Sequence, residues 1–307
     1  MATEGSLKAI IAALLANLGI AITKFVAYIF SGSASMLAES VHSLADSGNQ
    51  LLLIIGGRRA RRSASAEHPF GFGRTRYVYA FIVSVVLFTV GGLFSLYEGI
   101  DKLNNSHQIT NIWLPISVLL VAIVLESFSL RTAVVEANKV RGNQSWINFI
   151  RKAKAPELPV VLLEDLAALI GLSLALLGVG LSAVTGNEVF DAYGTLAIGV
   201  LLVIVAIILG LEMASLLIGE GAGPNQVAQI RKALAETEGV ESVIHLKTLY
   251  LGPEELMLGA KIAISEKATG QDIARIIDLA EANVHAVLPV AKVIYLEPDI
   301  YQPKTTA

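Results

Sequence analysis

Six long apolar blocks dominate the sequence and restrict the chain to an architecture that spans a membrane. Each block is close to the roughly 20 residues that an α-helix needs to cross the hydrocarbon core of a bilayer. Charged residues make up 16% of the 307 residues, whereas a typical soluble domain contains about 25%. We therefore predict six transmembrane helices, at approximately residues 7–30, 36–57, 77–100, 112–135, 158–184 and 190–218.

Basic residues are concentrated in two of the loops, and this asymmetry predicts the orientation. The loops at 31–35 and 185–188 are nearly free of charge, whereas the loops after the second and fourth spans are rich in arginine and lysine. Because basic loops stay on the cytoplasmic side, we expect a multi-pass protein with both termini in the cytoplasm. We expect the bacterial plasma (inner) membrane. The basic residues are Arg58, Arg59, Arg61, Arg62, Arg74, Arg76, Lys139, Arg141, Arg151, Lys152 and Lys154.

The chain changes character after Gly219, where the small residues GEGAGP form a linker. The segments that follow alternate between helical and strand periodicity, in the order αββαβ. This order predicts a small cytoplasmic α+β domain of ferredoxin-like type. We therefore divide the chain into a six-span, all-α transmembrane domain at 1–219 and a cytoplasmic domain at 220–307. The expected elements are helices at 225–238 and 271–287 and strands at 240–251, 256–264 and 291–296.

His42 and Asp46 lie within the second apolar block. They are four residues apart, so on a helix they are separated by about 40° and share one face. Ionisable groups inside a membrane usually mark an ion path or a proton relay. The chain has no cysteine, which leaves His, Asp and Glu as possible metal ligands. We predict that both residues bind metal; the alternative is a buried hydrogen-bonded pair that only holds helices together.

Glu164 and Asp165 interrupt the fifth apolar block. Adjacent residues diverge by about 100° on a helix, so we expect one side chain to face the site and the other to point elsewhere. Asp165 is favoured for the site, and the alternative is pairing with a neighbouring helix. Asn49 and Glu126 are weaker candidates: Asn49 as a hydrogen-bond donor behind the ligands, and Glu126 for helix pairing or proton passage.

Four stretches together resemble the cation diffusion facilitator family of zinc transporters. The resemblance extends over nearly the whole chain, and it looks closest to the branch that includes the mitochondrial zinc transporter of animals. The stretches are AESVHSLADSGNQ, HPFGFGRTRYVYAF, VGGLFSLYEGIDKL and VLLEDLAALIG.

The resemblance implies a homodimer that exports divalent metal from the cytoplasm in exchange for protons. In this family the transport site takes two ligands from the second span and two from the fifth, each pair four residues apart. His42, Asp46 and Asp165 match three of these positions. The fourth falls at Val161, which cannot bind metal, so water, Asn49 or a shifted Glu164 is expected to complete the shell.

The resemblance also bears on the cytoplasmic domain, which in this family often binds metal through histidines. Two of the usual histidine positions fall at Lys261 and Leu296, neither of which suits zinc. We therefore expect this domain to dimerise but to bind little or no metal.

The predicted function is proton-coupled antiport of a divalent metal, with Zn²⁺ as the expected substrate and Mn²⁺, Fe²⁺ and Co²⁺ as other possible ones. We expect no cofactor, no nucleic-acid partner and no enzymatic activity, since the chain lacks an HExxH motif. The alternative is a membrane metal sensor or scaffold with the same fold that does not transport. An intramembrane metalloenzyme is a weaker third option.

Overall fold

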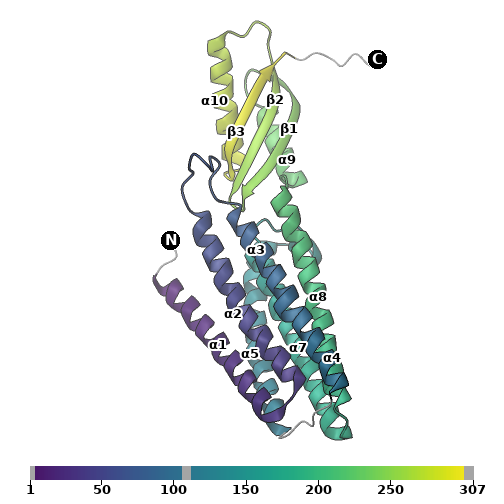
Figure 1. The fold of residues 1–307 in the computed structure, drawn as a ribbon. Helices are drawn as coiled ribbons and strands as arrows, with labels where there is room; N and C mark the ends of the chain where they lie inside the picture. Colours follow the sequence, from purple (N-terminus) through teal and green to yellow (C-terminus); the bar gives the residue numbers. More distant parts are fainter. Residues whose placement is uncertain (1–3, 106–111, 301–307) are drawn as a thin grey trace, which may run out of the picture. The chain divides into compact units, whose positions relative to one another are not determined.

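The computed structural model describes residues 4–105 and 112–300, with side chains from residue 17 onward. The chain forms two compact units. The first contains the chain up to Arg59 together with Arg76–Ala214, and the second contains Ala60–Thr75 together with the chain from Ser215 onward. The first unit is helical, and the second holds the sheet (Figure 1).

Long helices occupy all six apolar blocks, as the sequence predicts. The third block forms an almost continuous helix in three pieces, and a short helix that was not predicted, α6, precedes α7. The helices are α1 (Glu4–Ser31), α2 (Ala34–Ala60), α3 (Thr75–Val86), η1 (Leu87–Leu93), α4 (Phe94–Asn104), α5 (Trp113–Arg141), α6 (Trp146–Lys152), α7 (Glu157–Thr185) and α8 (Val189–Ile218).

The composition of these helices fits a lipid environment. In the part of the chain that the structure describes, the α3–η1–α4 helix, α5, α7 and α8 are long and apolar enough to cross a membrane, and α1 is apolar from Asn17 to Ser31. Large apolar side chains cover the outer surface, where lipid tails replace water as the solvent. Examples are Ile29, Phe128, Val184 and Leu211. Helix α2 is less apolar because it carries buried polar side chains, among them Glu39, His42 and Asn49.

The η1 segment is a π-helix in the middle of the third span. Such a segment inserts an extra residue into the turn and often lies near a functional site. Its glycines allow close contacts: a Cβ atom at Gly92 would lie 2.7 Å from the Val203 side chain, and one at Gly91 would lie 3.8 Å from Nδ1 of His42. The segment therefore brings the third span against both α8 and α2.

The second unit confirms the predicted αββαβ order. It contains α9 (Pro224–Ala235), β1 (Val240–Gly252), β2 (Glu255–Ile264), α10 (Gly270–Val287) and β3 (Ala291–Asp299). The sheet order is β1-β2-β3, with β1 antiparallel and β3 parallel to the central β2. Both helices pack against the sheet to form the core, which includes Ile230, Leu234, Leu256, Leu258 and Val284. A capping box formed by Thr269 and Asp272 begins α10.

The segment between α2 and α3 packs on the β1–β2 hairpin within the second unit. A Cβ atom at Gly73 would lie 2.7 Å from the carbonyl oxygen of Leu251 and 3.1 Å from Cα of Gly252. Only glycine permits so close an approach of two backbones. His68, in the same segment, stacks on Phe72 with ring centroids 4.5 Å apart.

Candidate functional site

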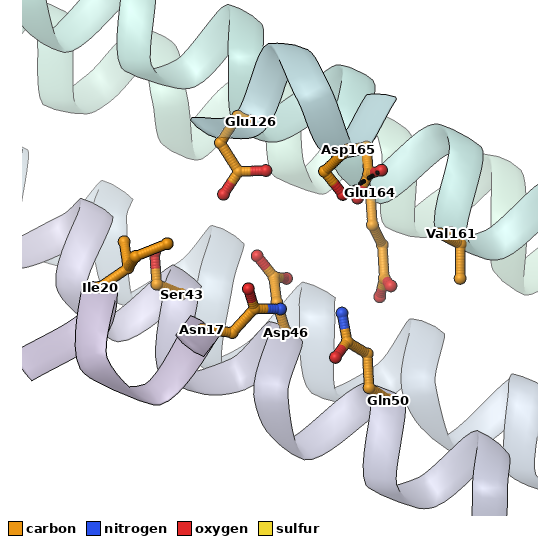
Figure 2. A pocket seen from close by; sticks show the side chains of 10 residues that line it. Asn17, Ile20, Ser43, Asp46, Gln50, Glu126, Val161, Glu164 and Asp165 are labelled. Carbon is orange, nitrogen blue, oxygen red and sulfur yellow. Dashed lines mark hydrogen bonds between the residues drawn. The ribbon is translucent and has the colours of Figure 1, made fainter. Parts of the chain in front are cut away.

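A cavity in the first unit is lined by residues from α1, α2, α5 and α7. Eight of its ten lining residues are polar, although the helices that carry them are mostly apolar (Figure 2). The four acidic residues among them come from three different helices. The lining residues are Asn17, Ile20, Ser43, Asp46, Gln50, Glu126, Ser129, Val161, Glu164 and Asp165.

His42 and Asp46 are neighbours, as their spacing on α2 predicts. Nε2 of His42 lies 3.4 Å from Oδ2 of Asp46. His42 is 1% exposed, and it lies beside Gly91 of the π-helix rather than on the cavity wall. Neither ring nitrogen nor Oδ1 of Asp46 makes a hydrogen bond within the described part of the chain. These buried atoms therefore retain unused capacity for a ligand or a proton.

Glu164 and Asp165 both line the cavity, so the prediction that one of them points elsewhere is wrong. The two side chains point in different directions, as those of adjacent helical residues must. Each accepts a hydrogen bond from a different neighbouring helix. Oε1 of Glu164 accepts a 2.7 Å hydrogen bond from Nδ2 of Asn49 on α2. Oδ2 of Asp165 accepts a 2.9 Å hydrogen bond from Ser129 on α5.

The four predicted ligands form two pairs in this structure, one on α2 and one on α7. Within residues 4–105 and 112–300, no group of three or more His, Cys, Asp or Glu side chains is close enough to hold a metal ion. Figure 2 shows Asp46 on one wall of the cavity, with Glu126 and Asp165 on the opposite wall. The described residues thus form each of the two pairs, but the two pairs lie too far apart to make one coordination shell.

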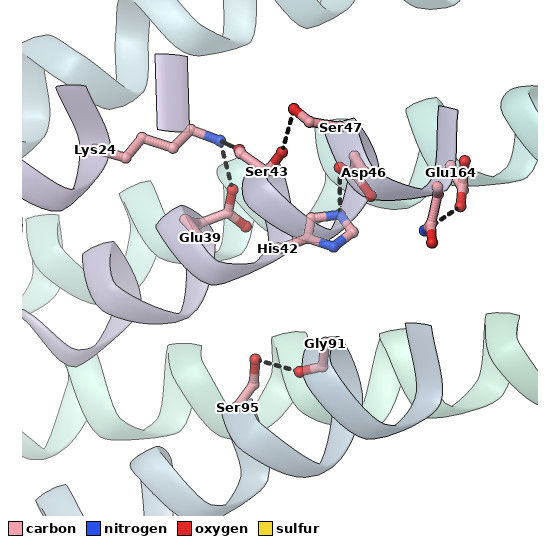
Figure 3. A network of polar contacts seen from close by, with 10 residues as sticks. Lys24, Glu39, His42, Ser43, Asp46, Ser47, Gly91, Ser95 and Glu164 are labelled. Carbon is pink, nitrogen blue, oxygen red and sulfur yellow. Dashed lines mark hydrogen bonds and ion pairs between the residues drawn. The ribbon is translucent and has the colours of Figure 1, made fainter. Parts of the chain in front are cut away.

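Sequence analysis missed a buried ion pair next to this site. Nζ of Lys24 on α1 lies 3.0 Å from Oε2 of Glu39 and donates a 2.7 Å hydrogen bond to Oγ of Ser43, both on α2 (Figure 3). The available signal was the position of Glu39, which precedes His42 by three residues and so shares its side of the helix. Gln50 and Ser129 also line the cavity, and no sequence motif marks either residue as part of a site.

The second unit has an ion-pair cluster at Lys261. Its Nζ lies 2.8 Å from Oδ2 of Asp299 and 2.9 Å from Oε1 of Glu297. Hydrogen bonds to Asp299 and Glu297 raise the pKa of Lys261 above its ordinary value. The same contact lowers the pKa of Asp299, with help from the backbone N–H of Ile300. At this position the domain presents an ammonium group, which binds carboxylates and cannot bind zinc.

Two family descriptions match nearly the whole chain. Residues 10–218 match the cation efflux transmembrane domain, and residues 222–299 match the cytoplasmic domain of cation efflux proteins. The chain belongs to the cation efflux family. This confirms the resemblance described from the sequence.

Curated relatives include the mitochondrial proton-coupled zinc antiporter SLC30A9 of Homo sapiens, which is 32% identical over 244 residues, covering 78% of this chain and 42% of the relative. Metal tolerance protein C4 of Arabidopsis thaliana is 30% identical over 261 residues, covering 84% of this chain and 57% of the relative. The chain thus matches about half the length of these relatives. A solved structure, MamM-CTD 215-293, is 19% identical, with a TM-score of 0.24, and the match covers 25% of this chain and 96% of that one.

Proposed function

We propose that the protein exports divalent metal ions, with zinc as the principal substrate, in exchange for protons. The observation that carries the proposal is the polar cavity between α1, α2, α5 and α7, lined by the carboxyl groups of Asp46, Glu126, Glu164 and Asp165. Ionisable groups at this depth are costly and mark ion pathways. The names of the mitochondrial relatives, zinc antiporters in human and other animals, support zinc and proton coupling.

The proposed ligands are His42 and Asp46 on α2 and Asp165 on α7, with Glu164 as a fourth. Imidazole and carboxylate groups suit zinc and also admit Mn²⁺, Fe²⁺ and Co²⁺. Glu164 becomes available as a ligand when it exchanges its hydrogen bond to Asn49 for the metal. Val161 lines the cavity but offers no ligand atom, so water is expected to fill any remaining position.

Metal binding requires the pairs on α2 and α7 to come closer together than they are in this structure. A relative movement of these helices is what alternating access to a site between them would produce. Metal binds deprotonated carboxylates and a neutral imidazole. Protons therefore compete with metal for the same atoms, and a proton gradient across the membrane drives release on one side.

The proposed assembly is a homodimer formed through the cytoplasmic domain, with both termini in the cytoplasm. The basic loops that follow the second and fourth spans support this orientation. The animal relatives are named as mitochondrial, and a bacterial plasma membrane stays a prediction from the sequence.

A second candidate function is metal sensing or scaffolding without transport. It is favoured by Val161, which occupies a position that the resemblance assigns to a ligand, and by the separation of the two residue pairs. A sensor would bind metal without moving it across the membrane, so the two functions differ in flux.

Metal uptake into proteoliposomes under an imposed pH gradient tests the proposal. The wild type should take up zinc, and Asp46→Ala and Asp165→Ala should each abolish the gradient-driven flux. Glu136→Ala is the matched control, because Glu136 is an exposed carboxylate on α5 that pairs with Lys139 away from the cavity. Normal flux in either cavity variant would refute the site, and absence of flux in well-folded wild type would favour the sensor.

A further inference from the structure

Lys24 is a fully buried cation in the membrane-spanning unit, with 1% of its surface exposed. Its ammonium group has three N–H donors, and Glu39 and Ser43 accept two hydrogen bonds from it. A lysine near the end of a span normally extends its head group to water. Here the side chain is instead held between α1 and α2, so its positive charge stays inside the protein.

Within the described residues, only one of the two carboxylate oxygens of Glu39 makes a hydrogen bond. Its Oε2 binds Lys24, but its buried Oε1 makes no hydrogen bond within the described residues. That oxygen lies against α7, where a Cβ atom at Gly171 would be 2.8 Å away. The Lys24–Glu39 pair therefore lies where α1, α2 and α7 meet, and a single glycine provides the space.

The charge of Lys24 reaches the cavity. Ser43, which accepts one of its hydrogen bonds, lines the cavity. Figure 3 shows Lys24 reaching from α1 to Glu39 and Ser43, with His42 and Asp46 on the same helix, α2. A fixed positive charge that is hydrogen-bonded to a residue of the cavity wall, inside a protein with little water, opposes the binding of another cation there.

We propose that Lys24 is a tethered cation that competes with the transported metal for the negative charge of the cavity. The carboxylate of Glu39 offsets part of the positive charge of Lys24 and so weakens this competition. The inference rests on the proposed function. An exporter must bind its substrate weakly enough to release it, and the four carboxyl groups that line the cavity attract a divalent cation strongly. A lysine that cannot leave the protein limits the affinity without itself being transported.

A purely structural ion pair makes a different prediction. Removing either partner of such a pair leaves an uncompensated buried charge and weakens the fold in both cases. A tethered cation instead predicts opposite effects on metal affinity: loss of Lys24 makes the site more negative, and loss of Glu39 makes it more positive. Loss of both restores the original net charge.

The experiment measures zinc binding by titration calorimetry on the full chain in detergent, with size-exclusion chromatography to verify folding. We expect Lys24→Met to bind zinc about tenfold more tightly than the wild type and Glu39→Gln about tenfold more weakly. The double variant should return to within about threefold of wild type. Lys24→Arg, which keeps the charge, is the matched control and should stay near the wild-type affinity. In proteoliposomes, Lys24→Met should turn over more slowly despite its tighter binding.

The outcomes separate this inference from the proposed function. Absence of zinc binding by well-folded wild type would refute both. Binding by wild type with unchanged or weaker affinity in Lys24→Met would refute the tethered cation alone. If Lys24→Met does not fold, Glu39→Gln and the double variant decide the question: equal affinity in these two variants would overturn the inference, and recovery in the double variant would support it.

Discussion

The carboxylate of Asp191, near the start of α8, accepts a 2.8 Å hydrogen bond from the backbone N–H of Ala34, the first residue of α2. It also accepts hydrogen bonds from the hydroxyl groups of Ser33 at 2.9 Å and Ser35 at 2.5 Å. The first N–H groups of a helix have no partner within the helix, and a negative charge there is favoured by the helix dipole. Asp191 is fully buried, so one side chain both caps α2 and joins it to α8.

Replacement of Asp191 by Ala should therefore destabilise the protein. We expect a loss of about 2 kcal/mol or more, because several buried donors lose a charged acceptor together. Asp191→Asn should lose less, since the amide oxygen still accepts. The measurement is the thermal unfolding midpoint in detergent, with Asp101→Ala, an exposed carboxylate on α4, as the control. Equal midpoints for the Asp191 and Asp101 variants would contradict the capping role.

Two glycines of α7 should respond differently to substitution. A Cβ atom at Gly178 would lie 2.9 Å from the carbonyl oxygen of Phe190 and 3.3 Å from Cα of Asp191, whereas one at Gly180 would meet nothing within 4 Å. Small residues allow helices in membranes to approach closely. Gly178→Val should cost about 1–3 kcal/mol, and Gly180→Val should be nearly neutral, as measured by thermal unfolding. Similar losses of stability at both positions would indicate that helix propensity, rather than packing, determines the effect of the substitution.

Val161 is the position at which a new ligand should be gained. It lines the cavity on the same helix as Glu164 and Asp165. Val161→Asp adds a carboxylate four residues before Asp165, and on one face of the helix the two groups can share an ion. We expect zinc to bind about tenfold more tightly and to be released more slowly, as shown by calorimetry and proteoliposome flux. Val161→Asn is the near-isosteric control without charge, and unchanged affinity in Val161→Asp would argue against a site at this place.

The contact between Lys261 and Asp299 should give the cytoplasmic unit a defined pH dependence. Because the pKa of Asp299 is lowered by folding, its contribution to stability is present above its ordinary pKa, near 4, and is lost as the pH falls through the lower folded value. The raised pKa of Lys261 acts in the opposite direction, so its contribution is lost only as the pH rises through the folded value above about 10.

Hydrogen exchange of the full chain measures this effect locally. Asp299→Asn should exchange faster than the wild type in β2 and β3 at pH 7. The difference should disappear at an acidic pH below the lowered pKa of Asp299, where the wild-type carboxylate is also protonated. Asp278→Asn, an exposed carboxylate on α10, is the control. A difference of the same size at both pH values would show that the charge of Asp299 is not the cause.

The parts of this fold that the sequence predicted are those determined by local pattern. The apolar blocks became the long helices, and the alternation of residues after Gly219 became the αββαβ unit. The contact between His42 and Asp46 follows from the rise and twist of a single helix. None of these inferences requires knowledge of how helices face one another.

The parts that escaped prediction depend on contacts between helices. Lys24 and Glu39 are on separate helices, and nothing in either segment tells which way α1 is rotated against α2. Likewise, the positions of Glu164 and Asp165 follow from Asn49 and Ser129, which are distant in sequence. The resemblance to the family identified Val161 and Lys261 as positions that lack an expected ligand. The neighbours of these two residues are visible only in the structure.

The π-helical turn at Leu87–Leu93 divides the third span into two helices of different phase. An extra residue in one turn rotates everything after it by about 100° relative to an uninterrupted α-helix. The faces of α3 and α4 must therefore be assigned separately, and a single helical wheel drawn over Thr75–Asn104 mixes them. Deletion of one residue within the turn would turn the α4 lysine, Lys102, away from the carbonyl oxygen of Gly32 that it contacts at 2.9 Å. The π-helical turn thus allows α3 and α4 to present different faces to their neighbours within one span.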